Sequence, residues 1–132
     1  MGKYGRAAIR AAELWRLGIA QSPQEAWDLA VVEVFPTPSS QDKACPKGAF
    51  LGLCEAGLVD GIDAGSYTSS QDNKRYAIDA VGKLRTTPSL ANDAGELWRK
   101  VAGEKRPNSQ MDVVIALWNA GLINQLPGSQ HG

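Results

Sequence analysis

The sequence predicts an all-α fold of six helices, organised as a tandem duplication of a three-helix unit. Apolar residues recur at helical spacing in six segments, residues typical of helix starts and ends flank these segments, and blocks of the first half reappear in the second. A chain of 132 residues is of ordinary size for one domain. We therefore expect a single helical domain over 1–132, with repeat units at about 4–62 and 73–124 and a flexible tail over 125–132.

The first two predicted helices span 4–17 and 23–35. The apolar stripe of the first helix consists of Ala8, Ala11, Ala12, Trp15 and Ile19. The second begins with a capping box, because Ser22 can accept a hydrogen bond from the N–H of Glu25 and Glu25 can reach back to the N–H of the cap. Pro23 between them suits the first helical position.

A third helix is predicted over 46–56, after prolines at positions 36 and 38 break the second helix. Gly57 can adopt the left-handed conformation that ends a helix, and Leu58 supplies the apolar contact of a Schellman motif. These two residues therefore predict that the helix over 46–56 ends just before residue 58.

The second half predicts three more helices, over 73–85, 94–101 and 109–120. Asp93 and Glu96 form a capping box for the middle one. Ser109 is the expected N-cap of the last one, with Asp112 in the capping-box position. Gly121 is placed to end that helix as Gly57 ends its counterpart.

Three blocks of sequence recur in the same order in the two halves. Residues 8–11 match 77–80, residues 22–27 match 93–98, and residues 53–59 match 117–123. Each unit alone is too small to bury its apolar stripes, so we expect the two units to pack about an approximate twofold axis. The four Trp residues are expected in the shared core.

Composition narrows the classes of function. The 14 Lys and Arg residues balance 14 Asp and Glu residues, whereas nucleic-acid-binding domains usually carry a dense basic face. Two Cys and one His make a four-ligand zinc site implausible. The longest apolar stretch is far shorter than a membrane span, and the N-terminal residues lack the apolar segment of a secretory signal. We expect a cytoplasmic protein with no membrane association, no metal and no cofactor.

Three segments carry a resemblance to a known family: MGKYG at the start, CPKGAF from Cys45 and NSQMDV from Asn108. With them, nearly the whole chain resembles a family of short, uncharacterised bacterial proteins grouped as a domain of unknown function. The resemblance implies a bacterial, cytoplasmic origin and brings no activity, ligand or catalytic residue.

The strongest functional signal is basic charge beside two equivalent helix starts. A helix N-terminus presents free N–H groups and a positive dipole end, which favour anions. We therefore predict a non-catalytic binding or regulatory module that acts through protein contacts or a small anionic ligand. The candidate anion-binding residues are Lys43, Cys45, Lys47, Lys105, Arg106, Asn108, Ser109 and Gln110. Whether the two starts lie close together is left open by the sequence.

Two alternative functions are also compatible with the sequence. Cys45 precedes Pro46 at a helix start between two lysines, a setting that favours a thiolate, so a small enzyme with a reactive cysteine is one alternative. The purely structural interpretation is that Cys45 replaces the usual polar residue at an N-cap, because the repeat aligns Cys45 with Ser109. A nucleic-acid-binding helical protein is the other, because the end of the helix over 46–56 resembles that of a recognition helix. Cys54 is expected in the core.

Overall fold

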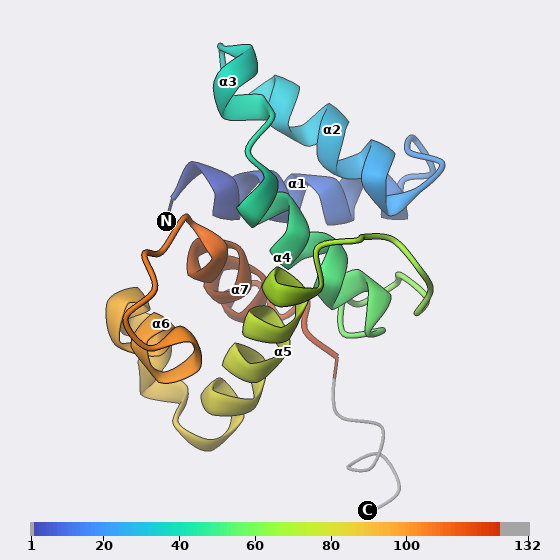
Figure 1. The fold of residues 1–132 in the computed structure, drawn as a ribbon. Coiled ribbons are helices and arrows are strands. Elements are labelled where there is room, and N and C mark those ends of the chain that lie inside the picture. The colour runs from blue at the N-terminus through green and yellow to red at the C-terminus, as the bar shows by residue number, and fades with distance from the viewer. Residues whose placement is uncertain (1, 125–132) are drawn as a thin grey trace, which may run out of the picture.

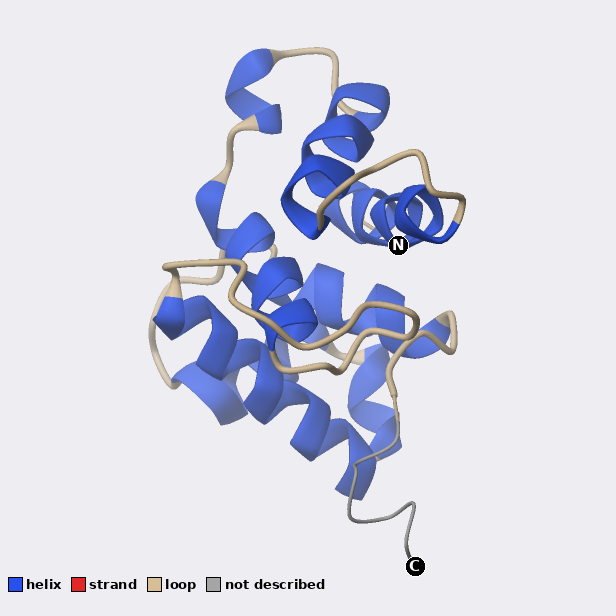
Figure 2. Ribbon diagram, turned by 90° about the vertical axis from the view of Figure 1, so that its right-hand side faces the viewer, coloured by secondary structure: helices blue, strands red, loops and turns tan. Residues whose placement is uncertain are grey.

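The computed structural model describes residues 2–124, which contain seven α-helices and one 3₁₀-helix. Their bounds are α1 Lys3–Arg16, α2 Pro23–Val34, α3 Pro38–Gln41, α4 Ala44–Glu55, α5 Gln71–Thr86, η1 Pro88–Asn92, α6 Ala94–Ala102 and α7 Gln110–Asn119. Figure 2 shows helices and loops only, so the predicted all-α class is confirmed. Among these residues no helix is both long and apolar enough to cross a bilayer. The expected tail over 125–132 lies outside the described residues.

All six predicted helices are present, but some starts differ from the prediction. α4 begins at Ala44, two residues early, because Pro46 falls in the first turn, where its missing N–H is not needed. α5 begins at Gln71 instead of residue 73. Pro38, expected only to break the preceding helix, starts the single turn of α3, and Pro88 starts η1, which the sequence did not predict.

Local capping rules account for the starts of α2 and α6. Ser22 accepts the N–H of Glu25 at 3.0 Å, and Asp93 accepts that of Glu96 at the same distance. The return bonds of the capping boxes are absent from these two starts: Glu25 accepts the N–H of Gln21 instead of the cap, and Glu96 pairs with an arginine of its own helix. Each box is therefore half formed.

The predicted Schellman ends are confirmed at α4 and α7. Gly57 and Gly121 have φ values of 74° and 73°. The N–H of Leu58 donates to the carbonyl of Leu53, and that of Leu122 to Leu117, both at 2.9 Å. The chain segments that follow then pair with each other, in an isolated antiparallel bridge between Val59 and Ile123.

The helices exchange partners between the two halves. In Figure 1, α1 and α2 lie together at one end of the molecule, α5, α6 and α7 lie toward the other, and α4 lies between them. α1 packs on α2 and on α7, while α5 packs on α6 and on α4. The first helix of each predicted unit thus contacts the last helix of the other unit. Tandem duplication and the approximate twofold axis stay predictions.

Two of the four tryptophans lie deep in the core. Trp27 is fully buried and stacks on Phe50, and Trp98 packs edge-on against Tyr76 with ring centroids 5.1 Å apart. Trp15 and Trp118 are half-buried and pack against the edge of the predicted core. Trp15 stays at the edge because its indole N–H donates to a surface carbonyl, that of Gly61, at 2.8 Å.

Two glycines let α4 and α5 approach closely. A Cβ added to Gly48 would lie 2.7 Å from Ser70 Oγ, and one added to Gly52 would lie 2.5 Å from Lys74 Cα. Side chains at these positions would force the helices apart. The contact fixes the start of α5 against α4.

Candidate functional site

The structure brings the two predicted basic helix starts together. Lys43 is the N-cap residue of α4, and its Nζ donates to Asn108 Oδ1 at 3.1 Å. Asn108 directly precedes Ser109, the N-cap residue of α7. Neither start has a side-chain capping hydrogen bond, in contrast to α2 and α6. We call this contact region, made of Lys43, Asn108, Ser109 and Gln110, the α4–α7 junction.

Cys45 does not occupy the N-cap position that the repeat alignment predicted. It is the second residue of α4 and is half-buried, because the helix starts at Ala44 and its cap falls on Lys43. Ser109 is a cap by position only, since its backbone is left-handed with φ 68° and its hydroxyl makes no capping bond. The expected capping-box bond between Asp112 and Ser109 is absent. The Asp112 carboxylate lies close to Gly2, because a Cβ added to that glycine would be 2.6 Å from Asp112 Oδ2. The starts of α4 and α7 are therefore offset relative to the repeat alignment, because the N-cap residues are Lys43 and Ser109 and not Cys45 and Ser109.

The other predicted cations contact separate parts of the protein. Lys47 forms an ion pair with Asp28 of α2 at 2.9 Å. Lys105 lies over the ring of Tyr76, 5.8 Å from its centroid, and its interaction with the Tyr76 side chain raises the pKa of Lys105. Arg106 is exposed and forms no ion pair with the described residues. Of the predicted cations, Lys43 is the one that bridges the two helix starts.

Gln110 extends the junction to a third helix start. Its side chain is 3% exposed, and it is the one buried polar residue of the described chain. Its Oε1 accepts the N–H of Asn108 at 2.6 Å, and its Nε2 donates to Asn73 Oδ1 at 3.1 Å. Asn73 in turn donates to Ser70 Oγ at 2.7 Å. Gln110 is thus a structural link between α7 and α5, and its amide is already satisfied.

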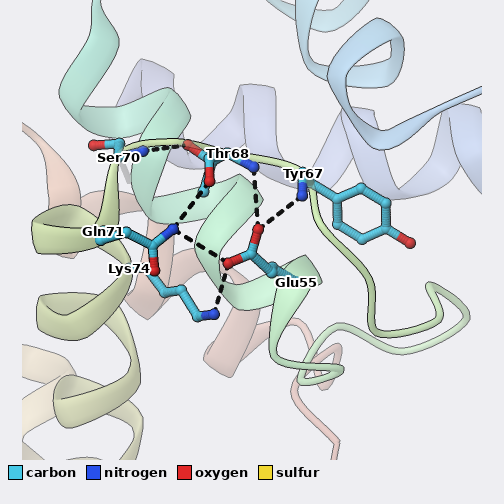
Figure 3. Close-up of polar contacts among 6 residues, drawn as sticks. All are labelled: Glu55, Tyr67, Thr68, Ser70, Gln71 and Lys74. Atoms are coloured by element: carbon cyan, nitrogen blue, oxygen red, sulfur yellow. Dashed lines mark hydrogen bonds and ion pairs between the residues drawn. The ribbon is translucent and has the colours of Figure 1, made fainter.

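A polar cluster that the sequence did not predict lies at the other end of α4. Figure 3 shows the Glu55 carboxylate facing the loop before α5. It accepts the N–H of Tyr67 at 2.7 Å and that of Thr68 at 3.2 Å. The ammonium of Lys74 lies 2.6 Å from its second oxygen, and Gln71 donates to the same oxygen at 3.4 Å.

Lys74 above all, and then the two backbone N–H groups, lower the pKa of Glu55 to about 2. The carboxylate therefore stays ionised at neutral pH and cannot act as a general acid there. Its role is to hold the loop against α4 and α5. No local motif marks Glu55, because its partners lie 12 to 19 residues further along the chain.

A cavity of about 320 Å³ adjoins the junction between the first turns of α6 and α7. Its lining residues are Ala94, Gly95, Trp98, Pro107, Asn108, Ser109, Met111 and Asp112. The cavity shares Asn108 and Ser109 with the junction, so a small group bound in it would lie beside the uncapped N–H groups of α7.

Neither cysteine forms part of a catalytic arrangement within the described residues. Cys54 is fully buried in the core, as predicted, and burial raises the pKa of its thiol. The thiol of Cys45 is free and half-buried, and the single histidine, His131, falls outside the described residues. The same residues contain no group of three His, Cys, Asp or Glu side chains that could hold a metal.

The helix that resembled a recognition helix is buried. Most of α4 is covered, including every residue from Gly48 to Cys54. α5, α7 and α2 all pack against it. A recognition helix must present a continuous exposed face to the major groove, and α4 has no such face.

Comparison with known proteins gives a family and no activity. A model described as a family of unknown function, DUF6979, matches residues 1–124. No curated protein and no solved structure matches the chain.

Proposed function

We propose that the chain, which belongs to the DUF6979 family of unknown function, is a non-catalytic binding module. Its ligand is an anionic group, of a small molecule or of a protein partner, held at the α4–α7 junction. The observation that carries the proposal is the 3.1 Å contact between Lys43 Nζ and Asn108 Oδ1, which joins two uncapped helix starts 65 residues apart in the sequence.

The physical case rests on donors that remain available at the junction. The first N–H groups of each helix lack intrahelical acceptors, and the two dipole ends add positive potential at one place. Lys43 is exposed and uses one of its three N–H donors on Asn108. Arg106 is exposed two residues before Asn108. An anion here would gain charge-assisted hydrogen bonds from a cation and from backbone donors.

The adjoining cavity supports a small ligand group more than a large one. Its volume of about 320 Å³ is at the low end of ligand pockets. Asp112 also lines the cavity, and its carboxylate repels an anion, so an anion fits best where it contacts Asn108 and Ser109. Phosphate and carboxylate groups match these donors.

Thermal unfolding in the presence of anions tests the proposal. The wild-type chain is compared with a Lys43→Glu, Arg106→Glu double variant at low salt, with phosphate, sulfate and nucleotides as probes. A double variant Arg6→Glu, Arg16→Glu is the matched control, because both residues are exposed on α1 and form no ion pair there.

The expected result is a probe-dependent rise in Tm for the wild type and the control, and its loss in the Lys43, Arg106 variant. The rise should shrink with added salt, because exposed charges are screened over about 8–10 Å at physiological ionic strength. Equal shifts in all three proteins, or none in any, would remove the junction as an anion site.

A further inference from the structure

Gly82 lies within α5, four residues before its end, without a packing reason. Glycine destabilises a helix interior relative to alanine, so an interior glycine needs an explanation. Gly48 and Gly52 of α4 have one, because a Cβ at either position would collide with α5 or the loop before it. A Cβ on Gly82 would meet no heavy atom of the described chain within 4 Å. No described residue therefore fills the space beside Gly82.

This open space belongs to a groove along α5, the largest of the cavities described, with a volume of about 640 Å³. Leu58, from the end of α4, and Ile78 of α5 give the groove an apolar wall. Gly82 lies one turn beyond Ile78 on the same face of the helix. A chain that crosses the groove could therefore approach the α5 backbone closely at Gly82.

Three cations line the same groove. Lys83 and Arg85 come from α5 and Lys100 from α6, and none of them forms an ion pair with the described residues. Asp79 is the one carboxylate among the lining residues. The guanidinium of Arg85 donates to the carbonyl of Asn124, which leaves most of its five N–H donors for another acceptor. The groove is thus positive within a chain of zero net charge.

We propose that this groove binds an acidic segment of a partner protein. Carboxylates of the segment pair with Lys83, Arg85 and Lys100, an apolar side chain packs on Leu58 and Ile78, and the backbone passes over Gly82. Charge complementarity favours this occupant, since the three cations form no ion pair with the described residues and attract anionic groups, while the apolar wall favours a hydrophobic side chain.

A polypeptide fits this surface better than a nucleic acid. Nucleic-acid sites use a dense basic face, often with exposed aromatic rings for stacking. Here Asp79 lies among the cations, and no aromatic residue lines the groove. The groove also shares no residue with the cavity beside the α4–α7 junction, so this proposal does not rest on the proposed function.

Nuclear magnetic resonance titration of the full-length, ¹⁵N-labelled protein tests the inference. The probe is a twelve-residue peptide of repeating Glu-Glu-Leu units. Two control peptides replace all Glu by Lys or all Leu by Ser. We expect amide shifts from the Glu-Leu peptide over residues 78–86 and around Lys100, weaker binding of the Ser peptide and none of the Lys peptide.

Two variants at one position separate occlusion of the groove from a change in helix stability. Gly82→Ala and Gly82→Leu both remove the interior glycine, but only leucine fills the space beside it. We expect Gly82→Leu to weaken peptide binding about tenfold, the effect of losing roughly one good contact, and Gly82→Ala to change it by less than about threefold. A Lys83→Glu, Lys100→Glu variant should weaken binding at least as much, whereas Arg6→Glu, Arg16→Glu should not.

The alternatives give different results. Unchanged affinity in Gly82→Leu, or equal binding of the Lys peptide, would overturn the proposal. So would the absence of shifts at millimolar peptide, or shifts confined to another face. If a single-stranded RNA oligonucleotide shifts the same amides more strongly than the Glu-Leu peptide does, the groove is a nucleic-acid site. The proposal of a protein partner is then wrong. Loss of anion binding at the junction would leave all these readouts unaffected.

Discussion

The carboxylate of Glu55 lies 2.6 Å from the ammonium of Lys74, and both side chains are largely shielded from water, with exposed fractions of 9% and 25%. The same carboxylate accepts two backbone N–H groups of the loop before α5. One ionised group thus joins the end of α4, the loop and α5.

Glu55→Gln should lower the free energy of unfolding at pH 7 by about 1–2 kcal/mol, because it removes a charged hydrogen-bond acceptor from a shielded pair. The folded-state pKa of Glu55 is about 2, below its value in the unfolded chain. Its stabilisation is therefore present above pH 4.5 and is lost as the pH falls toward 2. Urea unfolding of both proteins from pH 7 to pH 2 should show the difference shrinking in that window. Glu33→Gln, at an exposed ion pair with Arg10, is the control and should cost less than about 1 kcal/mol.

The two cysteines should respond differently to the same substitution. Cys54→Ser places a hydroxyl in a fully buried apolar site and should destabilise the protein by about 1–3 kcal/mol. Cys45→Ser, at the half-buried second position of α4, should change stability by less than about 0.5 kcal/mol. Denaturant unfolding measures both. Labelling with a thiol reagent should modify Cys45 in the folded protein and Cys54 only after unfolding; fast labelling of Cys54 would contradict its burial.

Gly52→Ala and Gly82→Ala should have opposite signs. A Cβ at position 52 would lie 2.5 Å from the Lys74 backbone, so the helices must separate, at a cost of about 1–3 kcal/mol. A Cβ at position 82 has free space and replaces an interior glycine, which should stabilise α5 by about 0.5–1 kcal/mol. Thermal and urea unfolding give the two values. A destabilising Gly82→Ala would mean that α5 requires its glycine for a structural reason.

A fragment of residues 1–63 should not fold as a monomer. It contains α1, α2, α3 and α4 but lacks α7, on which α1 packs, and α5, on which α4 packs. Large apolar surfaces would therefore face water. Circular dichroism and analytical ultracentrifugation check this prediction. A monomeric fragment with full helicity and a cooperative urea transition would show that the first unit needs no partner.

Rules that involve neighbouring residues predicted much of the fold. Ser22 and Asp93 cap their helices, and Gly57 and Gly121 end theirs, because each effect depends on residues within one or two turns. The error at Cys45 has a related cause. The repeat alignment transferred the cap position of Ser109 to Cys45, but the two helices do not start at equivalent residues.

The candidate site was predicted only in part, because its contacts are between residues far apart in the chain. Sequence patterns named Lys43 and Asn108, but their hydrogen bond depends on how α4 packs against α7. Lys47 was also predicted from basic charge beside a helix start, but it forms an ion pair with Asp28 of α2. Gln110 was predicted to bind the anion, but it is buried and its amide donates to Asn73. Pairing of this kind leaves no periodic trace in the sequence.

The contact between α1 and α7 also sets the order in which the chain can fold during its synthesis. α1 is made first, and about 90 residues separate its end at Arg16 from the start of α7 at Gln110. At roughly 5–20 residues per second, the ribosome needs about 5–20 s to complete that interval. α1 can pair with α2 in that time, but the face that it buries against α7 stays uncovered until the last helix emerges. The part of α1 that packs on α7 therefore faces water during that interval.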